Sequence, residues 1–82
     1  MTRILRFTAS WCGPCKMLSE NLQHAEIKLP IEVVDIDVFP DVATEFGIRS
    51  VPTLVMMDGN IEVKRMTGVI STKEITEWAS TN

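Results

Sequence analysis

The stretch Trp11-Cys12-Gly13-Pro14-Cys15 contains both cysteines of this chain, two residues apart. An apolar run precedes the stretch, and apolar residues at helical spacing follow it. A helix N-terminus carries unpaired N–H groups and about half a positive charge, which favours thiolate over thiol. Because the thiolate is the nucleophilic form of cysteine, the stretch predicts a reactive dithiol at the start of a helix.

Two other uses of the cysteines have less support from the residues. A disulfide that closes a ring of about four residues contributes only about 2 kcal/mol in the chain-entropy estimate. A structural zinc site takes four ligands, and His24 is the one histidine available to join the two cysteines. We therefore expect redox chemistry, and neither a structural disulfide nor a bound metal.

Length and composition indicate a single small domain over residues 1–82, with a hydrophobic content of 45% that suffices for a packed core. The net charge of −3, without a basic stripe, argues against a nucleic-acid partner. No apolar run approaches the roughly 20 residues needed to cross a bilayer. The opening residues are too few and too charged for a signal peptide. We expect a soluble, cytoplasmic monomer that contacts no membrane.

Apolar periodicity and turn residues predict seven secondary-structure elements. These are strands over residues 3–9, 31–36, 53–57 and 61–67, and helices that begin near residue 14, cover residues 39–46 and follow residue 71. Gly13 lies near the first N-cap, and Pro14 suits the first helical position. Ser71 and Glu74 form a capping box, and Asp58-Gly59-Asn60 predicts a hairpin turn.

The order of these elements is β-α-β-α-β-β-α. A helix between the first two strands implies a parallel pair with a right-handed crossover, and the hairpin adds two antiparallel strands. We therefore expect an α/β fold, with a four-stranded mixed sheet and helices on both faces. Cys12 is expected just outside the first helix and open to attack, whereas Cys15 lies in the first turn on the sheltered face.

Three segments make the chain resemble the thioredoxin family. Trp11-Cys12-Gly13-Pro14-Cys15-Lys16 matches the active-site motif, Gly47-Ile48-Arg49-Ser50-Val51-Pro52-Thr53 resembles the segment with the cis-proline, and Gly68 matches the substrate-groove glycine. The resemblance covers nearly the whole chain, without the extra N-terminal strand and helix of full-length thioredoxins. In lacking these two elements, the chain is similar to small thioredoxins of archaea and viruses and to glutaredoxins. The resemblance implies a minimal thioredoxin fold and a cis Val51–Pro52 bond.

The resemblance also implies an activity, that of a protein-disulfide reductase and electron carrier. Cys12 would form a mixed disulfide with a protein substrate, and Cys15 would then close a redox-active Cys12–Cys15 disulfide. No cofactor would be bound, and a thioredoxin reductase would supply the electrons. The implied active-site and substrate-binding residues beside the cysteines are Trp11, Gly13, Pro14, Val51, Pro52, Gly68 and Val69.

The chain departs from the family pattern at Arg6, where a buried aspartate usually assists proton transfer from the second cysteine. Val33 stands where a neighbouring lysine is common. An arginine on a central strand must be paired or must reach solvent with its head group. Asp35 follows Val33 on the same strand face, so we expect an Arg6–Asp35 charge pair beneath the active site. The proton of Cys15 would then pass to Asp35, to water or to the thiolate leaving from Cys12.

Two other functions stay open on the sequence. A glutaredoxin-like protein would draw electrons from glutathione or from a dedicated reductase. However, Gly13-Pro14 differs from the usual glutaredoxin Pro-Tyr pair, and residues 68–70 lack the paired glycines of a glutathione cradle. A redox-independent binding module would use the same fold without its thiols.

Overall fold

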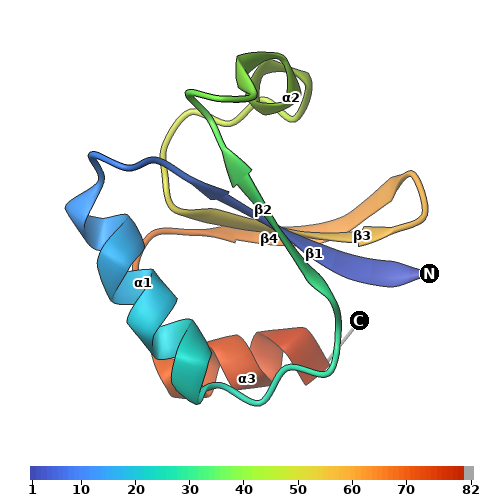
Figure 1. Cartoon of the computed structure of the whole chain (residues 1–82). Helices are drawn as coiled ribbons and strands as arrows, with labels where there is room; N and C mark the ends of the chain where they lie inside the picture. The colour runs from blue at the N-terminus through green and yellow to red at the C-terminus, as the bar shows by residue number, and fades with distance from the viewer. Residues whose placement is uncertain (81–82) are drawn as a thin grey trace.

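A computed structural model of the chain describes residues 1–80, and Figure 1 shows their arrangement. Its elements in chain order are β1 (Thr2–Thr8), α1 (Gly13–His24), β2 (Ile31–Asp35), α2 (Pro40–Glu45), β3 (Thr53–Asp58), β4 (Ile61–Thr67) and α3 (Thr72–Ser80). The predicted order β-α-β-α-β-β-α is confirmed. Predicted and observed strand ends differ by at most one residue, which is within the usual uncertainty of such bounds.

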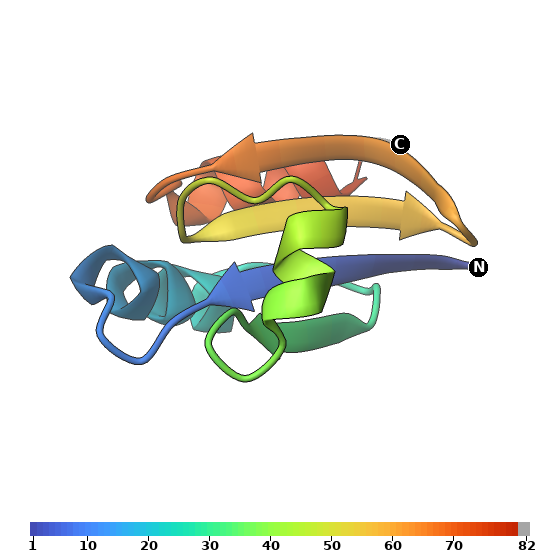
Figure 2. The same cartoon turned by 90° about the horizontal axis from the view of Figure 1, so that it is seen from above.

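The four strands form one mixed sheet in the order β2-β1-β3-β4, as Figure 2 shows from above. β1 and β2 run parallel, with Ile4 beside Ile31 and Thr8 beside Asp35. β1 pairs antiparallel with β3, and β3 pairs antiparallel with β4. The crossover through α1 produces the parallel pair, and the hairpin produces the antiparallel pair β3–β4. The expected four-stranded mixed sheet is therefore confirmed.

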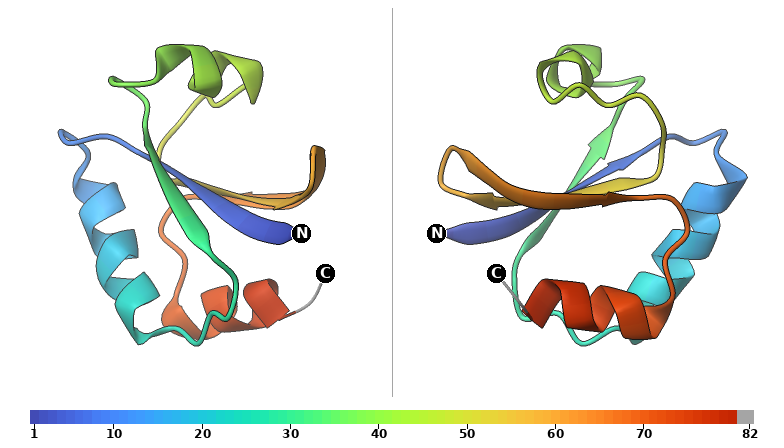
Figure 3. Two further views of the ribbon diagram at one scale, coloured as in Figure 1. Left: turned by 45° about the vertical axis from the view of Figure 1, so that its right-hand side comes forward. Right: turned by 180° about the vertical axis from the view of Figure 1, so that it is seen from behind.

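Helices α1 and α3 cover one face of the sheet, and α2 lies over the other (Figures 1 and 3). Alternation along β1 sends Ile4 to the first face and Leu5 and Phe7 to the second, because successive strand residues point to opposite sides. The core under α1 and α3 consists of Ile4, Leu18, Leu54, Met56, Ile70 and Ile75. The core under α2 consists of Leu5, Phe7, Val55 and Met57. The central strands are thus buried on both faces.

Local signals account for several ends of the elements. Before α3, the N–H of Glu74 donates to Ser71 Oγ at 3.1 Å, and the Ser71 hydroxyl donates to Glu74 Oε1 at 3.1 Å. The predicted capping box is therefore confirmed. Gly59 has a φ of +62° in the β3–β4 hairpin, a conformation that glycine adopts without steric cost. Across residues 1–80, none of the helices has the length and apolar character needed to cross a bilayer.

Candidate active site

The N-terminus of α1 holds the two cysteines, which are joined as a disulfide. Cys12 has extended backbone angles (φ −93°, ψ 109°), and its Sγ accepts the N–H of Cys15 at 3.1 Å. Cys12 itself is therefore the N-cap, and Gly13 and Pro14 are the first helical residues. The prediction that placed the N-cap near Gly13 was one position late. The missing N–H of proline costs nothing here, since N–H groups of the first turn have no intrahelical partner.

The two cysteine residues are almost equally buried in the disulfide form. Cys12 is 4% exposed and Cys15 is 2% exposed. Cys12 was expected to be open, and this part of the prediction is wrong for the oxidised chain. Both cysteines pack with Ala9, and the side chains of Ile36 and Val51 close the cluster. These neighbours cover Cys12 although it lies at the very start of the helix.

The loop before β3 supplies the second side of the site. The Val51–Pro52 peptide bond is cis, as predicted. The carbonyl oxygen of Val51 lies 3.6 Å from Cys12 Sγ, and Pro52 is fully buried. Thr53 begins β3, and its hydroxyl donates to the Ser50 carbonyl oxygen at 2.8 Å. The loop is thus held against the dithiol from both sides of the proline.

Gly68 and Val69 follow β4 and complete the site. The N–H of Gly68 donates to the Pro52 carbonyl oxygen at 2.9 Å, and the φ of Gly68 is +98°. Val69 is 44% exposed. Because a φ of +98° strains any residue with a Cβ, glycine suits this turn. The structure therefore brings the three segments Trp11–Cys15, Val51–Pro52 and Gly68–Val69 together.

Asp37 contacts the active-site loop and was not among the predicted site residues. Trp11 Nε1–H donates to Asp37 Oδ2 at 2.8 Å. The Trp11 ring is otherwise 67% exposed. The two residues lie 26 positions apart, so no local pattern links them. This hydrogen bond orients an exposed aromatic ring beside the disulfide.

Asn21 was also missed by the sequence reasoning. The side-chain Nδ2 of Asn21 donates to the Ile70 carbonyl oxygen at 2.9 Å, and the main-chain carbonyl oxygen of Asn21 accepts the Thr72 hydroxyl at 3.2 Å. These bonds tie the middle of α1 to the loop that carries Val69. An asparagine inside a helix gives no sequence signal for such a role. The helix that bears the cysteines and the loop after β4 are therefore held together.

The expected ion pair between Arg6 and Asp35 is wrong. Asp35 Oδ1 instead accepts the N–H of Asp37 at 2.9 Å, and none of the ion pairs among residues 1–80 includes Arg6. The register places Arg6 beside Val33 and Asp35 beside Thr8. Asp35 thus stands at the end of β2, where its short side chain bonds the following turn, as aspartate commonly does. Burial of the guanidinium lowers the pKa of Arg6.

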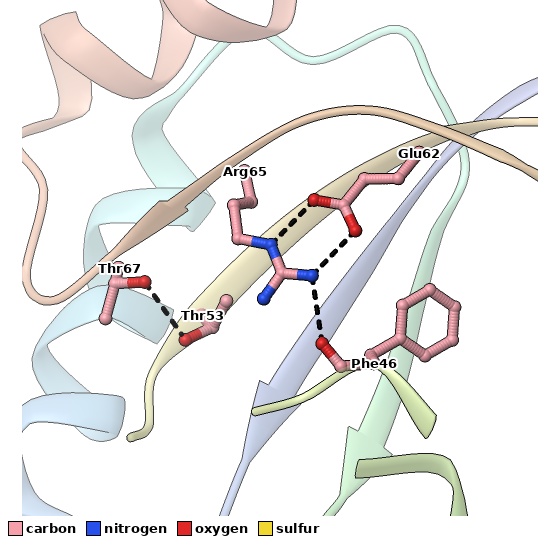
Figure 4. A network of polar contacts seen from close by, with 5 residues as sticks. All are labelled: Phe46, Thr53, Glu62, Arg65 and Thr67. Carbon is pink, nitrogen blue, oxygen red and sulfur yellow. Dashed lines mark hydrogen bonds and ion pairs between the residues drawn. The ribbon is translucent and has the colours of Figure 1, made fainter. Parts of the chain in front are cut away.

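A second polar cluster lies on the α2 side of the sheet, away from the cysteines. Arg65 donates twice to the Glu62 carboxylate at 2.6 Å and once to the Phe46 carbonyl oxygen at 2.9 Å, as Figure 4 shows. The hydrogen bond from Arg65 lowers the pKa of Glu62. The same residues line a hollow of about 480 Å³ that contains no cysteine or histidine. The cluster joins β4 to the end of α2 and offers no nucleophile.

The donor set of the described residues does not suit a metal. No three His, Cys, Asp or Glu side chains within residues 1–80 come together as metal ligands would. His24 lies in the last turn of α1, at the opposite end of that helix from the cysteines. The two cysteines at the start of α1 can interconvert between dithiol and disulfide forms.

Comparisons with known proteins agree with this geometry. A family model described as Thioredoxin matches residues 1–81. The chain is 37% identical over 73 residues to "Thioredoxin C-3" of Corynebacterium nephridii, covering 85% of this chain and 50% of that protein. It is 38% identical over 69 residues to a "Bifunctional thioredoxin reductase/thioredoxin" of Mycobacterium leprae, covering 79% of this chain and 15% of that protein. The chain thus spans half the length of the first relative, and less of the second.

A solved structure gives the same result for the fold. An N21Q mutant thioredoxin from Halobacterium salinarum superposes with a TM-score of 0.87 at 26% identity, over 96% of this chain and 72% of that chain. The superposition therefore extends across nearly all of the sheet and helices described above.

Proposed function

The chain belongs to the thioredoxin family, and on that basis we propose that it is a thiol–disulfide oxidoreductase that reduces protein disulfides. The observation that carries the proposal is the Cys12–Cys15 disulfide at the N-terminus of α1. Because a disulfide that closes so small a ring adds little to the stability of the fold, a redox role explains it better than a structural role. The α1 N-terminus favours the thiolate form of a reduced cysteine at this position.

The proposed reaction has two exchange steps. The Cys12 thiolate attacks one sulfur of a substrate disulfide, and the other substrate sulfur leaves as a thiolate. Cys15 then attacks Cys12, the bond between Cys12 and the substrate breaks, and the substrate leaves fully reduced. The substrate gains two electrons and the protein dithiol loses two. Oxidised protein therefore needs a reductant before the next cycle.

Thiol pKa and positioning contribute to the rate to different extents. Lowering a thiol pKa from about 8.5 to about 7, a value already known for thioredoxin, raises the thiolate fraction at neutral pH about 16-fold. Intrinsic nucleophilicity falls about 5-fold over the same interval, so attack gains only about 3-fold. A low pKa also makes Cys12 a good leaving group in the second step. Positioning of Cys15 beside the mixed disulfide supplies the rest of the rate enhancement.

The proposed substrate groove has three walls around Cys12, formed by Trp11, by Val51 with Pro52, and by Gly68 with Val69. Trp11 and Val69 are exposed, and the contacts described above hold the three walls next to one another. An extended substrate segment can pair with the main chain before Pro52, since proline cannot donate a hydrogen bond. Recognition through the main chain tolerates many side chains, which suits protein disulfides as a substrate class.

We propose a thioredoxin reductase as the electron donor. The Mycobacterium leprae relative is named as a reductase and a thioredoxin in one protein, which supports this pairing. The chain needs no bound cofactor in this scheme, because the dithiol itself carries the electrons. The proposed compartment is the cytoplasm, where thiols are kept reduced.

A disulfide-reduction assay tests the proposal, with thioredoxin reductase and NADPH as the electron source. We expect turnover by the wild-type protein, no activity in Cys12→Ser, and a trapped mixed disulfide in Cys15→Ser. Trapping by Cys12→Ser instead would reverse the two roles. Rapid turnover with glutathione alone would favour the glutaredoxin-like function. Unchanged cellular function in the double serine variant would favour a binding module.

A further inference from the structure

Arg6 lies on a central strand and has no charged partner among residues 1–80. It faces the α1 side of the sheet, beside Val33 on β2, and it is half-buried. No hydrogen bond or ion pair of the guanidinium occurs within residues 1–80. Burial lowers the pKa of Arg6, but guanidinium groups stay charged at neutral pH. A positive charge in this place gains most from an anion nearby.

Arg6 and Cys15 both line a hollow of about 190 Å³. Lys16 is the other charged residue lining this hollow, and Thr8, Ser10 and Ser19 contribute hydroxyl groups. Among residues 1–80, no carboxylate lines it. The hollow beside Cys15 is therefore cationic, polar and open to water.

The two carboxylates at and just after the end of β2 form hydrogen bonds with other groups. Asp35, at the end of β2, accepts the N–H of Asp37. Asp37 accepts the indole N–H of Trp11 on the other side of the active-site loop. Neither group pairs with Arg6, and among residues 1–80 no carboxylate joins Arg6 and Lys16 in lining the hollow beside Cys15.

We propose that Arg6 is a positioning residue whose positive charge favours the thiolate form of Cys15 in the mixed disulfide with the substrate. The inference rests on the proposed disulfide-reductase function and concerns its second step. The charge of Arg6 stabilises the Cys15 thiolate, and Arg6 does not accept the Cys15 proton as a base does. When the thiolate forms, the proton goes to water in the hollow.

The second exchange step then starts from an ionised nucleophile. The Cys15 thiolate donates an electron pair to Cys12 Sγ and forms the Cys12–Cys15 bond. The bond between Cys12 and the substrate breaks, and its electron pair leaves on the substrate sulfur. That sulfur takes a proton from water. The step thus needs no carboxylate to act as a base.

Titration of Cys15 tests the inference independently of turnover. In a Cys12→Ser background Cys15 is the single thiol, and ultraviolet absorbance of the thiolate reports its pKa. Arg6→Gln is expected to raise that pKa by about one unit, which corresponds to about tenfold less thiolate at neutral pH. Arg6→Lys should keep the wild-type value. Arg3→Gln is the matched control, because Arg3 lies on the same strand but pairs with Glu32.

The same substitutions in the intact dithiol predict a rate effect. Release of substrate from the mixed disulfide should slow about tenfold in Arg6→Gln at neutral pH, and the difference should vanish at alkaline pH, where Cys15 ionises in both proteins. If Arg6→Gln does not fold, Arg6→Met keeps the apolar stem and provides the same comparison.

Two results would overturn the inference. One is an unchanged Cys15 titration when Arg6 loses its charge, and the other is an equal shift in Arg3→Gln. Failure of the wild-type protein to reduce protein disulfides would instead refute the proposed function. The titration of Cys15 separates the two cases, since it needs no substrate.

Discussion

Leu18 provides a direct test of how α1 is seated on the sheet. Its side chain is fully buried, one turn after Cys15, in the core formed with Ile4, Leu54 and Ile75. Met17, the preceding residue of the same helix, is 58% exposed. Leucine and methionine have similar helix propensities, so Leu18→Ala and Met17→Ala differ mainly in the burial that is lost.

The two substitutions should differ several-fold in their effect on the free energy of unfolding. Leu18→Ala removes buried apolar atoms and leaves a cavity, for which losses of about 2.7–5 kcal/mol are usual. We expect about 3 kcal/mol, because α3 can move only partly into the space behind α1. A domain of this length has a total stability of about 4–12 kcal/mol, so the variant loses a quarter or more of it. Met17→Ala should stay within about 0.5 kcal/mol of the wild type.

Urea unfolding of the oxidised protein measures this difference. With an m value of about 1 kcal/mol/M, the expected loss lowers the midpoint by about 3 M at unchanged m. A loss below about 1 kcal/mol in Leu18→Ala, or equal losses in the two variants, would refute the buried orientation of this face of α1. The sheltered position of Cys15 depends on the same orientation.

Two further predictions concern the capping box of α3 and the ion pair on β4. Ser71→Ala removes the acceptor of the Glu74 N–H and should lower the free energy of unfolding by about 1 kcal/mol in urea; an unchanged midpoint would contradict the role of the cap. Because Arg65 lowers the pKa of Glu62, the pair stabilises the fold above the usual carboxyl pKa, and this stabilisation is lost as the pH falls through the lowered value. On acidification from neutral pH to about pH 3, the free energy of unfolding should therefore fall less in Glu62→Gln than in the wild type. The difference should be at most about 1 kcal/mol, because the pair is exposed and screened by solvent. An identical pH dependence of the two proteins would contradict this prediction.

Several features of the fold follow from short stretches of sequence. Pro14 after Gly13 indicated the start of a helix, and Ser71 with Glu74 indicated another, because caps act within one helical turn. Strand alternation and the turn at Asp58-Gly59-Asn60 predicted the sheet and its hairpin. Both signals lie within short stretches of the sequence, so they can be recognised without knowledge of the tertiary contacts.

The contacts that complete the site depend on residues far apart in the chain. Trp11 and Asp37 meet across the loop after β2, and Asn21 meets the backbone of Ile70 after β4. Spacing in the sequence carries no information on these pairs, because the strand register and the packing of α1 bring them together.

Arg6 and Asp35 show where sequence reasoning ends. The sequence by itself determined that an arginine would lie on the strand before the dithiol, and that the aspartate would share its face of the sheet. The tertiary structure alone decided which group the aspartate would bind. A nearby backbone N–H and a distant guanidinium compete for one short carboxylate, and the local partner wins because it requires ordering no long side chain. The arginine is thereby left facing the hollow that contains Cys15.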